Sequence, residues 1–244
     1  MATPVPQWPL LSGSAAGASA SLSIAGHTTT IGPFGPASGS APPAFDHWMS
    51  VASARQDDNL DPSSIWHPAV WLDAQGVSDD VSSKGFGVDN IALQASADIK
   101  SATLVLTDNP LSALSVLGLS VTATFIHASA DASYLFGANR GFLNGSASFG
   151  SLTIAGALIG RTLTFKGNAT ANDVIFHNDT VTVTLDKQAI TGFFPPGAAG
   201  ATSGSRITTD ALNIQLNNAH LFGQTISGNI DIGQASATLW PQHA

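Results

Sequence analysis

The carboxyl-terminal stretch from Arg206 to Leu239 alternates apolar and polar residues with a period of two. Leu212, Ile214 and Leu216 fall on one side of this pattern, and the residues between them are Asn or Gln. A turn-rich break at 217–223 separates this run from a second alternating run at 226–232. Strict alternation is typical of strands with one buried and one wet face, so the stretch predicts an antiparallel β pair.

Similar alternation recurs along most of the chain, with Gly-, Pro- and Asn-containing breaks between the runs. In the longest run the apolar positions change from odd to even numbers between Phe125 and Ile126. A change of phase by one residue predicts a β-bulge. Roughly ten or more short strands with turn signals at this spacing indicate an all-β fold. We expect an antiparallel, sandwich-like arrangement, with a barrel or a β-solenoid as the alternatives.

The chain divides by composition into a lead-in and one domain. Residues 1–17 are rich in Pro, Ser, Gly and Ala and are predicted to be a flexible N-terminal lead-in. Residues 18–240 fit a single β domain that can bury a sizeable core. This domain is expected to contain one long irregular loop, an Asp- and Trp-rich insertion at about 46–88. Long irregular segments inside compact domains are usually functional or disordered, and the tryptophans argue against disorder.

Charge excludes several classes of partner. Only 10% of the residues are charged, the net charge is −8, and every acidic residue is aspartate. Nucleic acids and anionic membrane surfaces need basic patches, so neither is an expected partner. No apolar run reaches the length of a membrane span. The absence of cysteine excludes a disulfide scaffold and a thiolate metal site.

The amino-terminal residues MATPVPQWPLL lack the basic region and apolar core of a signal peptide. Ala-Thr-Pro after an initiator Met is nevertheless typical of a mature secreted chain whose leader has been replaced. We therefore expect an exported protein, extracellular or on the cell surface, with a cytosolic origin as the alternative.

Several strand patterns resemble a known family. The runs TTDALNIQLNN (208–218) and TISGNIDIGQASA (225–237) resemble the end of the choice-of-anchor P family of bacterial exported proteins. The family's opening and middle strands resemble IAGHTTTIGPFGP (24–36), LSVLGLSVTATFIHASADASY (114–134) and GSASFGSLTIAG (145–156). The resemblance omits 46–88 and implies a β-rich, exported protein with exchangeable anchoring tails and no established activity. The chain departs from it by ending in Trp240-Pro-Gln-His-Ala, without a sorting tail.

The segment Asp57-Asp58-Asn59-Leu60-Asp61 is a candidate cation site. Calcium takes six to eight oxygen ligands, which closely spaced carboxylates and amides can supply. The spacing differs from an EF-hand loop, and the chain has no glutamate to act as a bidentate ligand. The alternative is a solvated turn, with Asp61 capping a helical turn. No cofactor is certain from the sequence, and calcium bound by Asp57, Asp58 and Asp61 is the candidate.

A second candidate combines Asp46, His47 and His67 as catalytic groups with Trp48, Trp66 and Trp71 as binding groups. Histidine and aspartate can perform acid–base chemistry or bind a transition metal, and tryptophan can stack on a sugar or an aromatic substrate. The alternative is that the tryptophans cap an open end of the β core and the histidines are incidental. If the chain has an active site, we expect it here.

A third group, His127, Ser129, Asp131 and Ser133, lies on the polar face of one predicted strand. Alternate residues of a strand are about 7 Å apart, which is too far for the hydrogen bonds of a catalytic triad. We interpret the group as a solvated face.

Three functions follow, in this order. The first is a non-enzymatic surface or matrix β protein that acts as a structural or binding module, through self-association or a glycan or surface ligand. The second is an extracellular enzyme for a polysaccharide, aromatic or lipid-like substrate, with its site at 46–88. The third is a small-molecule carrier with an apolar cavity inside the β walls. The sequence therefore leaves open whether the chain is an enzyme, and it favours a protein without catalytic activity.

Overall fold

The computed structural model describes residues 10–24, 27–59, 69–85, 90–107, 117–135, 140–192, 204–221 and 223–240. These residues form thirteen antiparallel strands and no helix, so the predicted all-β, sandwich-like fold is confirmed. Sheet A contains β1 (Leu10–Ile24), β2 (His27–Ile31), β3 (Ala37–Ala41), β10 (Asp173–His177), β11 (Val181–Thr191), β12 (Ser205–Leu221) and β13 (Gln224–Trp240). Sheet B contains β4 (Asp46–Asn59), β5 (Ala69–Lys84), β6 (Asn90–Thr107), β7 (Leu117–Leu135), β8 (Arg140–Ala155) and β9 (Leu163–Asn168).

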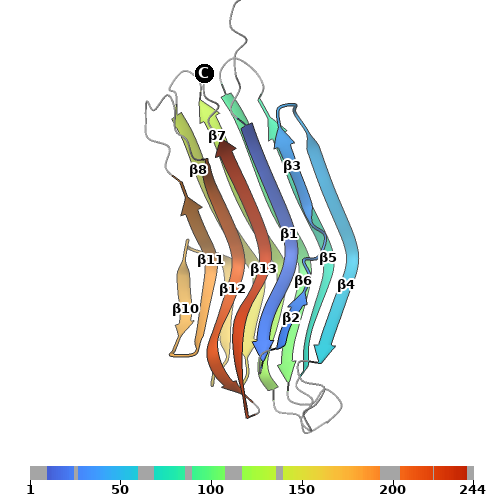
Figure 1. Ribbon diagram of the computed structural model, residues 1–244, viewed down its shortest axis with the longest axis vertical. Helices are drawn as coiled ribbons and strands as arrows, with labels where there is room; N and C mark the ends of the chain where they lie inside the picture. The colour runs from blue at the N-terminus through green and yellow to red at the C-terminus, as the bar shows by residue number, and fades with distance from the viewer. Residues whose placement is uncertain are drawn as a thin grey trace, which may run out of the picture.

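The strand order is a meander that visits sheet A, then sheet B, then sheet A again. Sheet B has the order β4-β5-β6-β7-β8-β9, and sheet A has the order β10-β11-β12-β13-β1-β2, with β3 also pairing with β1. The first and last strands, β1 and β13, are therefore neighbours along their whole length. Figure 1 shows the two sheets one behind the other. No strand is shared between the sheets in the described part of the chain, so the sandwich is open.

The core between the sheets consists of small and branched aliphatic side chains. In β12, Leu212, Ile214 and Leu216 are buried, as the alternation predicts. Many of the inward positions on both sheets are alanine, for example Ala95, Ala97 and Ala128. Short side chains let two sheets approach closely, and burial of their apolar surface is the main stabilising term of such a fold.

The predicted irregular insertion at 46–88 is wrong for its described residues, because 46–59 form β4 and 69–84 form β5. β4 is an edge strand whose side chains are mostly exposed, so it lacks the strong apolar alternation of a central strand. The inward face of β5 carries the polar Asp79 and Ser83, and it changes phase at Gly76. These features hide the period-two pattern.

The predicted flexible lead-in at 1–17 is also wrong where the structure describes it, because β1 begins at Leu10. Its glycines mark close sheet packing: a Cβ added to Gly13 would lie 2.6 Å from Leu93 Cδ2, and one added to Gly17 would lie 2.6 Å from Val77 Cγ1. A Gly- and Ser-rich composition therefore reflects contact between the sheets in this strand.

The predicted change of phase in β7 occurs at Phe125, where φ is 47°. It is not a bulge, because Ser101 faces Thr124 and Ile99 faces Ile126 without a shift of register. An extra residue in one strand would have displaced one of these pairs. Both strands therefore change phase together.

The same change of phase occurs in neighbouring strands of both sheets, and the residues at which it occurs form a row across the strands. The row runs through Gly76, Lys100, Phe125 and Gly150 in sheet B, and through Asp186, Ala211, Gly233 and Gly17 in sheet A, each skipped by the ladder pairing. Several of these residues have positive φ, including Gly76, Asp186 and Gly233. Figure 1 shows the strands bending at about mid-length. A coordinated row bends the sheets without disturbing their register.

Candidate functional site

The predicted acid–base residues Asp46 and His47 are consecutive in β4, so their side chains lie on opposite faces. The Asp46 carboxylate lies beside Asp80 of β5; burial, and then this neighbouring charge, raise the pKa of Asp80. His47 places its Nδ1 2.9 Å from the Ser38 carbonyl oxygen in β3. His67 lies outside the described residues. The structure therefore does not bring Asp46 and His47 to one site.

The described tryptophans of this region are far apart. Trp48 of β4 is 70% exposed and pairs with Asp80. Trp71 of β5 pairs with Asp57, nine residues further along β4. At the rise of an extended strand this separation is about 30 Å. Trp66 lies outside the described residues, and the two others do not share a binding surface.

The two described carboxylates of the predicted calcium site also point apart. Asp57 and Asp58 are consecutive in β4, and Asp58 Oδ2 accepts a hydrogen bond of 2.9 Å from the Thr29 hydroxyl of β2. On the same side of β4, Gln56 accepts the Gly32 N–H and donates to the Thr30 carbonyl oxygen. Asp58 and Gln56 thus join sheet B to sheet A. Asp61 lies outside the described residues, and the calcium site stays a prediction.

The polar face of β7 contains a histidine–carboxylate pair rather than a triad. His127 Nδ1 lies 2.8 Å from Asp98 Oδ1 on β6, and this hydrogen bond is the main cause of the raised pKa of His127. Ser129 shares a hydrogen bond with Ser146 of β8. Burial raises the pKa of Asp131. The hydroxyl of Ser129 is thus engaged across the sheet, and because Ser129 is buried the interpretation of this group as a solvated face is wrong at that residue.

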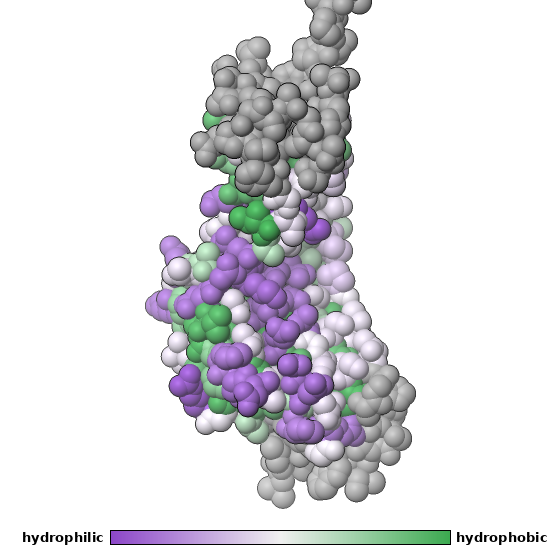
Figure 2. All heavy atoms as spheres, turned by 60° about the vertical axis from the view of Figure 1, so that its left-hand side comes forward, coloured by the Kyte–Doolittle hydropathy of each residue, from purple (hydrophilic) through white to green (hydrophobic). Residues whose placement is uncertain are grey.

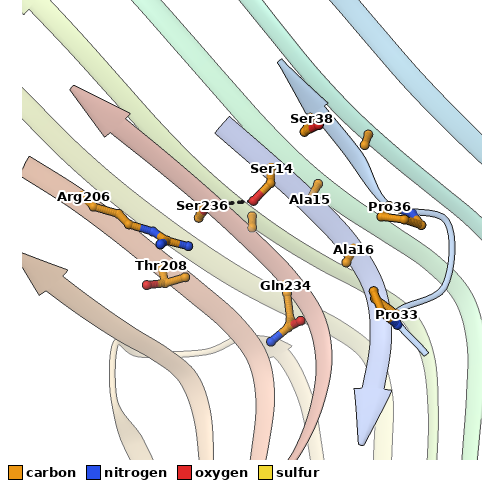
Figure 3. Close-up of a pocket in the computed structure, with 12 residues that line it drawn as sticks. Ser14, Ala15, Ala16, Pro33, Pro36, Ser38, Arg206, Thr208, Gln234 and Ser236 are labelled. Atoms are coloured by element: carbon orange, nitrogen blue, oxygen red, sulfur yellow. Dashed lines mark hydrogen bonds between the residues drawn. The ribbon is translucent and has the colours of Figure 1, made fainter. Parts of the chain in front are cut away.

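A pocket of about 300 Å³ lies on the outer face of sheet A (Figure 3). We call it the sheet A pocket. Ser14 and Ala16 of β1 and Gln234 and Ser236 of β13 form its floor. Arg206 and Thr208 of β12 stand on one side, and Pro33, Pro36 and Ser38 stand on the other. The link between β2 and β3 forms that second wall, held to β1 by hydrogen bonds of Phe34 with Gly17 and Ala18.

The register of sheet A lines up the hydroxyl groups of this pocket. Ser38 pairs with Ser14, Ser14 with Ser236, and Ser236 with Thr208, so one row crosses β3, β1, β13 and β12. The hydroxyls of Ser14 and Ser236 are 2.9 Å apart and hydrogen-bonded. Neighbouring strands are about 4.8 Å apart, which spaces these groups regularly. The pocket therefore offers several fixed hydrogen-bonding groups to one ligand.

Gln234 connects the pocket to a buried polar network on the same face. Its Nε2 donates to Asp210 Oδ1 at 3.3 Å, and its Oε1 accepts from the Ser19 hydroxyl at 3.4 Å. Burial, and then Asp231, raise the pKa of Asp210 to about 6. Asn213 donates to Asp231 and accepts from Lys187 at 3.0 Å. This network satisfies its own polar groups and holds Gln234 in place.

The outer face of sheet B carries a second cavity, of about 250 Å³, lined by Ser82, Lys84, Ala92, Leu93, Gln94, Asp131, Ala132 and Ser133. Two of these lining residues, Lys84 and Asp131, carry opposite charges. Among the described residues, no group of three or more His or Asp side chains is arranged to hold a metal ion.

Sequence reasoning missed the sheet A pocket, because its residues come from positions more than 220 apart in the chain. One signal was present: the polar positions of the first and last strands are mostly hydroxyl groups rather than charges. The pairing of β1 with β13 and the fold of the proline-rich link bring them together, and neither follows from local patterns.

Comparison with known proteins adds no identity: no family model matches the chain, and no curated protein matches it. The resemblance to the choice-of-anchor P family stays a prediction. No helix in the described part of the chain is long and apolar enough to cross a membrane.

Proposed function

We propose that the chain is an exported surface or matrix binding module that holds a saccharide in the sheet A pocket. The observation that supports this proposal is the pocket itself, in which a row of hydroxyls, a guanidinium and a fixed amide surround the methyl group of Ala16. Export and a surface or matrix location belong to the proposal. They rest on the low charge of the chain and on the family resemblance.

The lining matches the chemistry of a sugar ring. A saccharide has hydroxyl groups at its edge and C–H groups on its faces. Ser14, Ser236 and Thr208 can exchange hydrogen bonds with the hydroxyls. Pro33 and Pro36 offer apolar surface beside them. Small-molecule pockets combine a few fixed polar groups with apolar walls in this way, and a volume near 300 Å³ is at the lower end of their range.

The same lining favours binding over hydrolysis. Among the described residues, no aspartate or histidine lines the sheet A pocket. Glycoside hydrolysis needs a pair of carboxyl groups on either side of the scissile bond. Four described histidines hydrogen-bond to other residues of the chain: His47, His127, His177 and His220. An enzyme would need its acid and base within reach of the substrate, and the pocket does not supply them.

The outer surface suits a protein that works in a polar, hydrated setting. Figure 2, which brings the β10 and β11 side forward, shows hydrophilic side chains gathered over the middle of this face, with hydrophobic ones in small separate areas. Exposed apolar patches that would mark a lipid or large protein interface are therefore small in this view.

Filling the sheet A pocket should abolish binding without unfolding the protein. Ala16 is a half-buried floor residue, so Ala16→Trp places an indole in the ligand space. We expect the saccharide affinity to fall by at least about 10-fold, the loss expected when a few hydrogen bonds are removed. Isothermal titration calorimetry against a panel of oligosaccharides measures this change.

The matched control is Ala92→Trp, which fills the cavity on sheet B from another half-buried outward alanine. It should leave the affinity unchanged. If Ala92→Trp abolishes binding and Ala16→Trp does not, the assignment to the sheet A pocket is wrong. If the unaltered protein binds no saccharide of the panel, the proposed function itself is wrong.

A further inference from the structure

We propose that the ligand of the sheet A pocket is an anionic saccharide, whose carboxylate or sulfate group is bound by Arg206. This inference rests on the proposed function and narrows its ligand class. It starts from the charge of the pocket: the described lining residues include one cation, Arg206, and no anion. The chain as a whole carries a net charge of −8 and only four arginines, so an uncompensated arginine in a pocket is unusual here.

Arg206 has no acidic partner in the described part of the chain. The ion pair recorded there joins His127 to Asp98, on the other sheet. Lys187, not Arg206, is the cation that lowers the pKa of Asp210 and of Asp231. Those two carboxylates are also held by Gln234 and Asn213. The guanidinium charge is therefore available to a ligand.

The surroundings of Arg206 fit an oxyanion. Thr208 follows it by two residues on the same face of β12, and Thr208 pairs with Ser236, whose hydroxyl bonds to Ser14. Figure 3 shows the Arg206 side chain extending from β12 toward Thr208 and the strand that carries Gln234 and Ser236. Guanidinium binds planar carboxylates and sulfate-like groups through two parallel N–H donors. Hydroxyl donors beside it can satisfy the remaining oxygens of the anion.

The neutral part of the pocket then receives the ring of the same sugar. Ala16 presents its methyl group, whereas Ala15 and Ala235 present only backbone because their side chains are buried in the core; the two prolines close the opposite side. An anionic group on the ring at Arg206 and ring hydroxyls along the serine row would fix the orientation of the ligand. Uronate-type and sulfated saccharides share this chemistry, and the experiment distinguishes them.

The test measures affinities for three probes by isothermal titration calorimetry: trigalacturonate, a sulfated galactose trisaccharide and neutral maltotriose. The variants are Arg206→Met and Arg206→Lys. Arg206→Met keeps a long side chain without its charge, and Arg206→Lys keeps the charge without the two parallel N–H donors of the guanidinium. We expect Arg206→Met to lower the affinity for an anionic probe by about 10-fold or more, and the affinity for maltotriose by less than about 2-fold. Arg206→Lys should rescue part of the loss.

Arg55→Met is the matched control, because Arg55 is an exposed arginine on β4 of the other sheet. Arg206 is itself exposed, so thermal melting of each variant should match the unaltered protein. Tighter binding of trigalacturonate assigns a carboxylate, and tighter binding of the sulfated probe assigns a sulfate. Equal affinity for maltotriose, unchanged by Arg206→Met, overturns this inference and leaves the saccharide-binding function standing. Failure to bind any of the three probes, with saccharides of the wider panel also unbound, overturns both.

Discussion

Replacing Asp79 by valine should raise the melting temperature at pH 8.5 by on the order of 10 °C. Asp79 lies on the inward face of β5 and is fully buried, and among the described residues no donor meets hydrogen-bond geometry with its carboxylate oxygens, the Gly17 N–H being bonded to the Phe34 carbonyl oxygen. Burial raises the pKa of Asp79 to about 8; the nearby Gly17 amide opposes this rise, and the Asp98 charge adds to it. Above that pH the folded chain must hold an unpaired charge between its sheets, which is strongly unfavourable.

The sign of the pH dependence follows from the direction of the shift. The pKa of Asp79 is higher in the folded chain, at about 8, than its ordinary value of 3.8. The stabilisation by the bound proton is therefore complete below pH 3.8 and is lost as the pH rises to about 8. The corresponding loss of unfolding free energy is at most about 6 kcal/mol. Melting temperatures across pH 4.5 to 9 should thus fall steadily for the unaltered protein.

The Asp79→Val variant should show a much flatter profile. Valine suits a buried strand position, and Val77 and Val81 already occupy the same face of β5. Asp79→Asn should flatten the profile as well, without the gain from apolar burial. Asp57→Asn, at an exposed position of β4, is the control and should keep the steep profile. A steep profile in Asp79→Val would show that other buried carboxyls, such as Asp210, dominate the pH dependence.

The sequence predicts those strands whose inward face is continuously apolar. Leu212, Ile214 and Leu216 are buried as expected, because β12 is a central strand with a neighbour on each side. The sequence does not predict the full length of β4, because an edge strand buries little and its pattern is set by contacts such as Gln56 to Gly32 rather than by hydrophobicity. β5 is not predicted because Asp79, which is buried, has the sequence pattern of a solvent-exposed position. Local sequence patterns therefore fail to predict a strand where a polar residue is buried or where the strand buries few apolar residues.

The candidate sites show the same limit. Clusters that are close in sequence, such as Asp57 and Asp58, are separated by the alternation of a strand. Conversely, Ser14, Arg206 and Ser236 have no local signature in common, and only the pairing of the terminal strands joins them. Such pairing is long-range, so it depends on the whole arrangement of the sheets and not on any one segment.

That pairing leads to the second large effect, a loss of at least about 3 kcal/mol of unfolding free energy in Gly228→Ala. Gly228 of β13 faces Leu22 of β1, and its φ is 141°. A Cβ at this position would overlap the Ser21 carbonyl oxygen of β1, which is backbone and cannot turn aside. The substitution would therefore push apart the two terminal strands, in addition to straining the φ angle. Urea denaturation with linear extrapolation measures the change.

Gly223→Ala separates these two causes. Gly223 lies just before β13 with φ 75°, and a Cβ there would meet nothing within 4 Å. Its substitution carries only the strain of positive φ, about 1 to 2 kcal/mol. If Gly228→Ala cost no more than Gly223→Ala, close contact between β1 and β13 would not hold the sheet together at this point. If the expected difference appears, the contact between the terminal strands is a main determinant of the fold. The sheet A pocket would depend on it too, since its floor spans these same two strands.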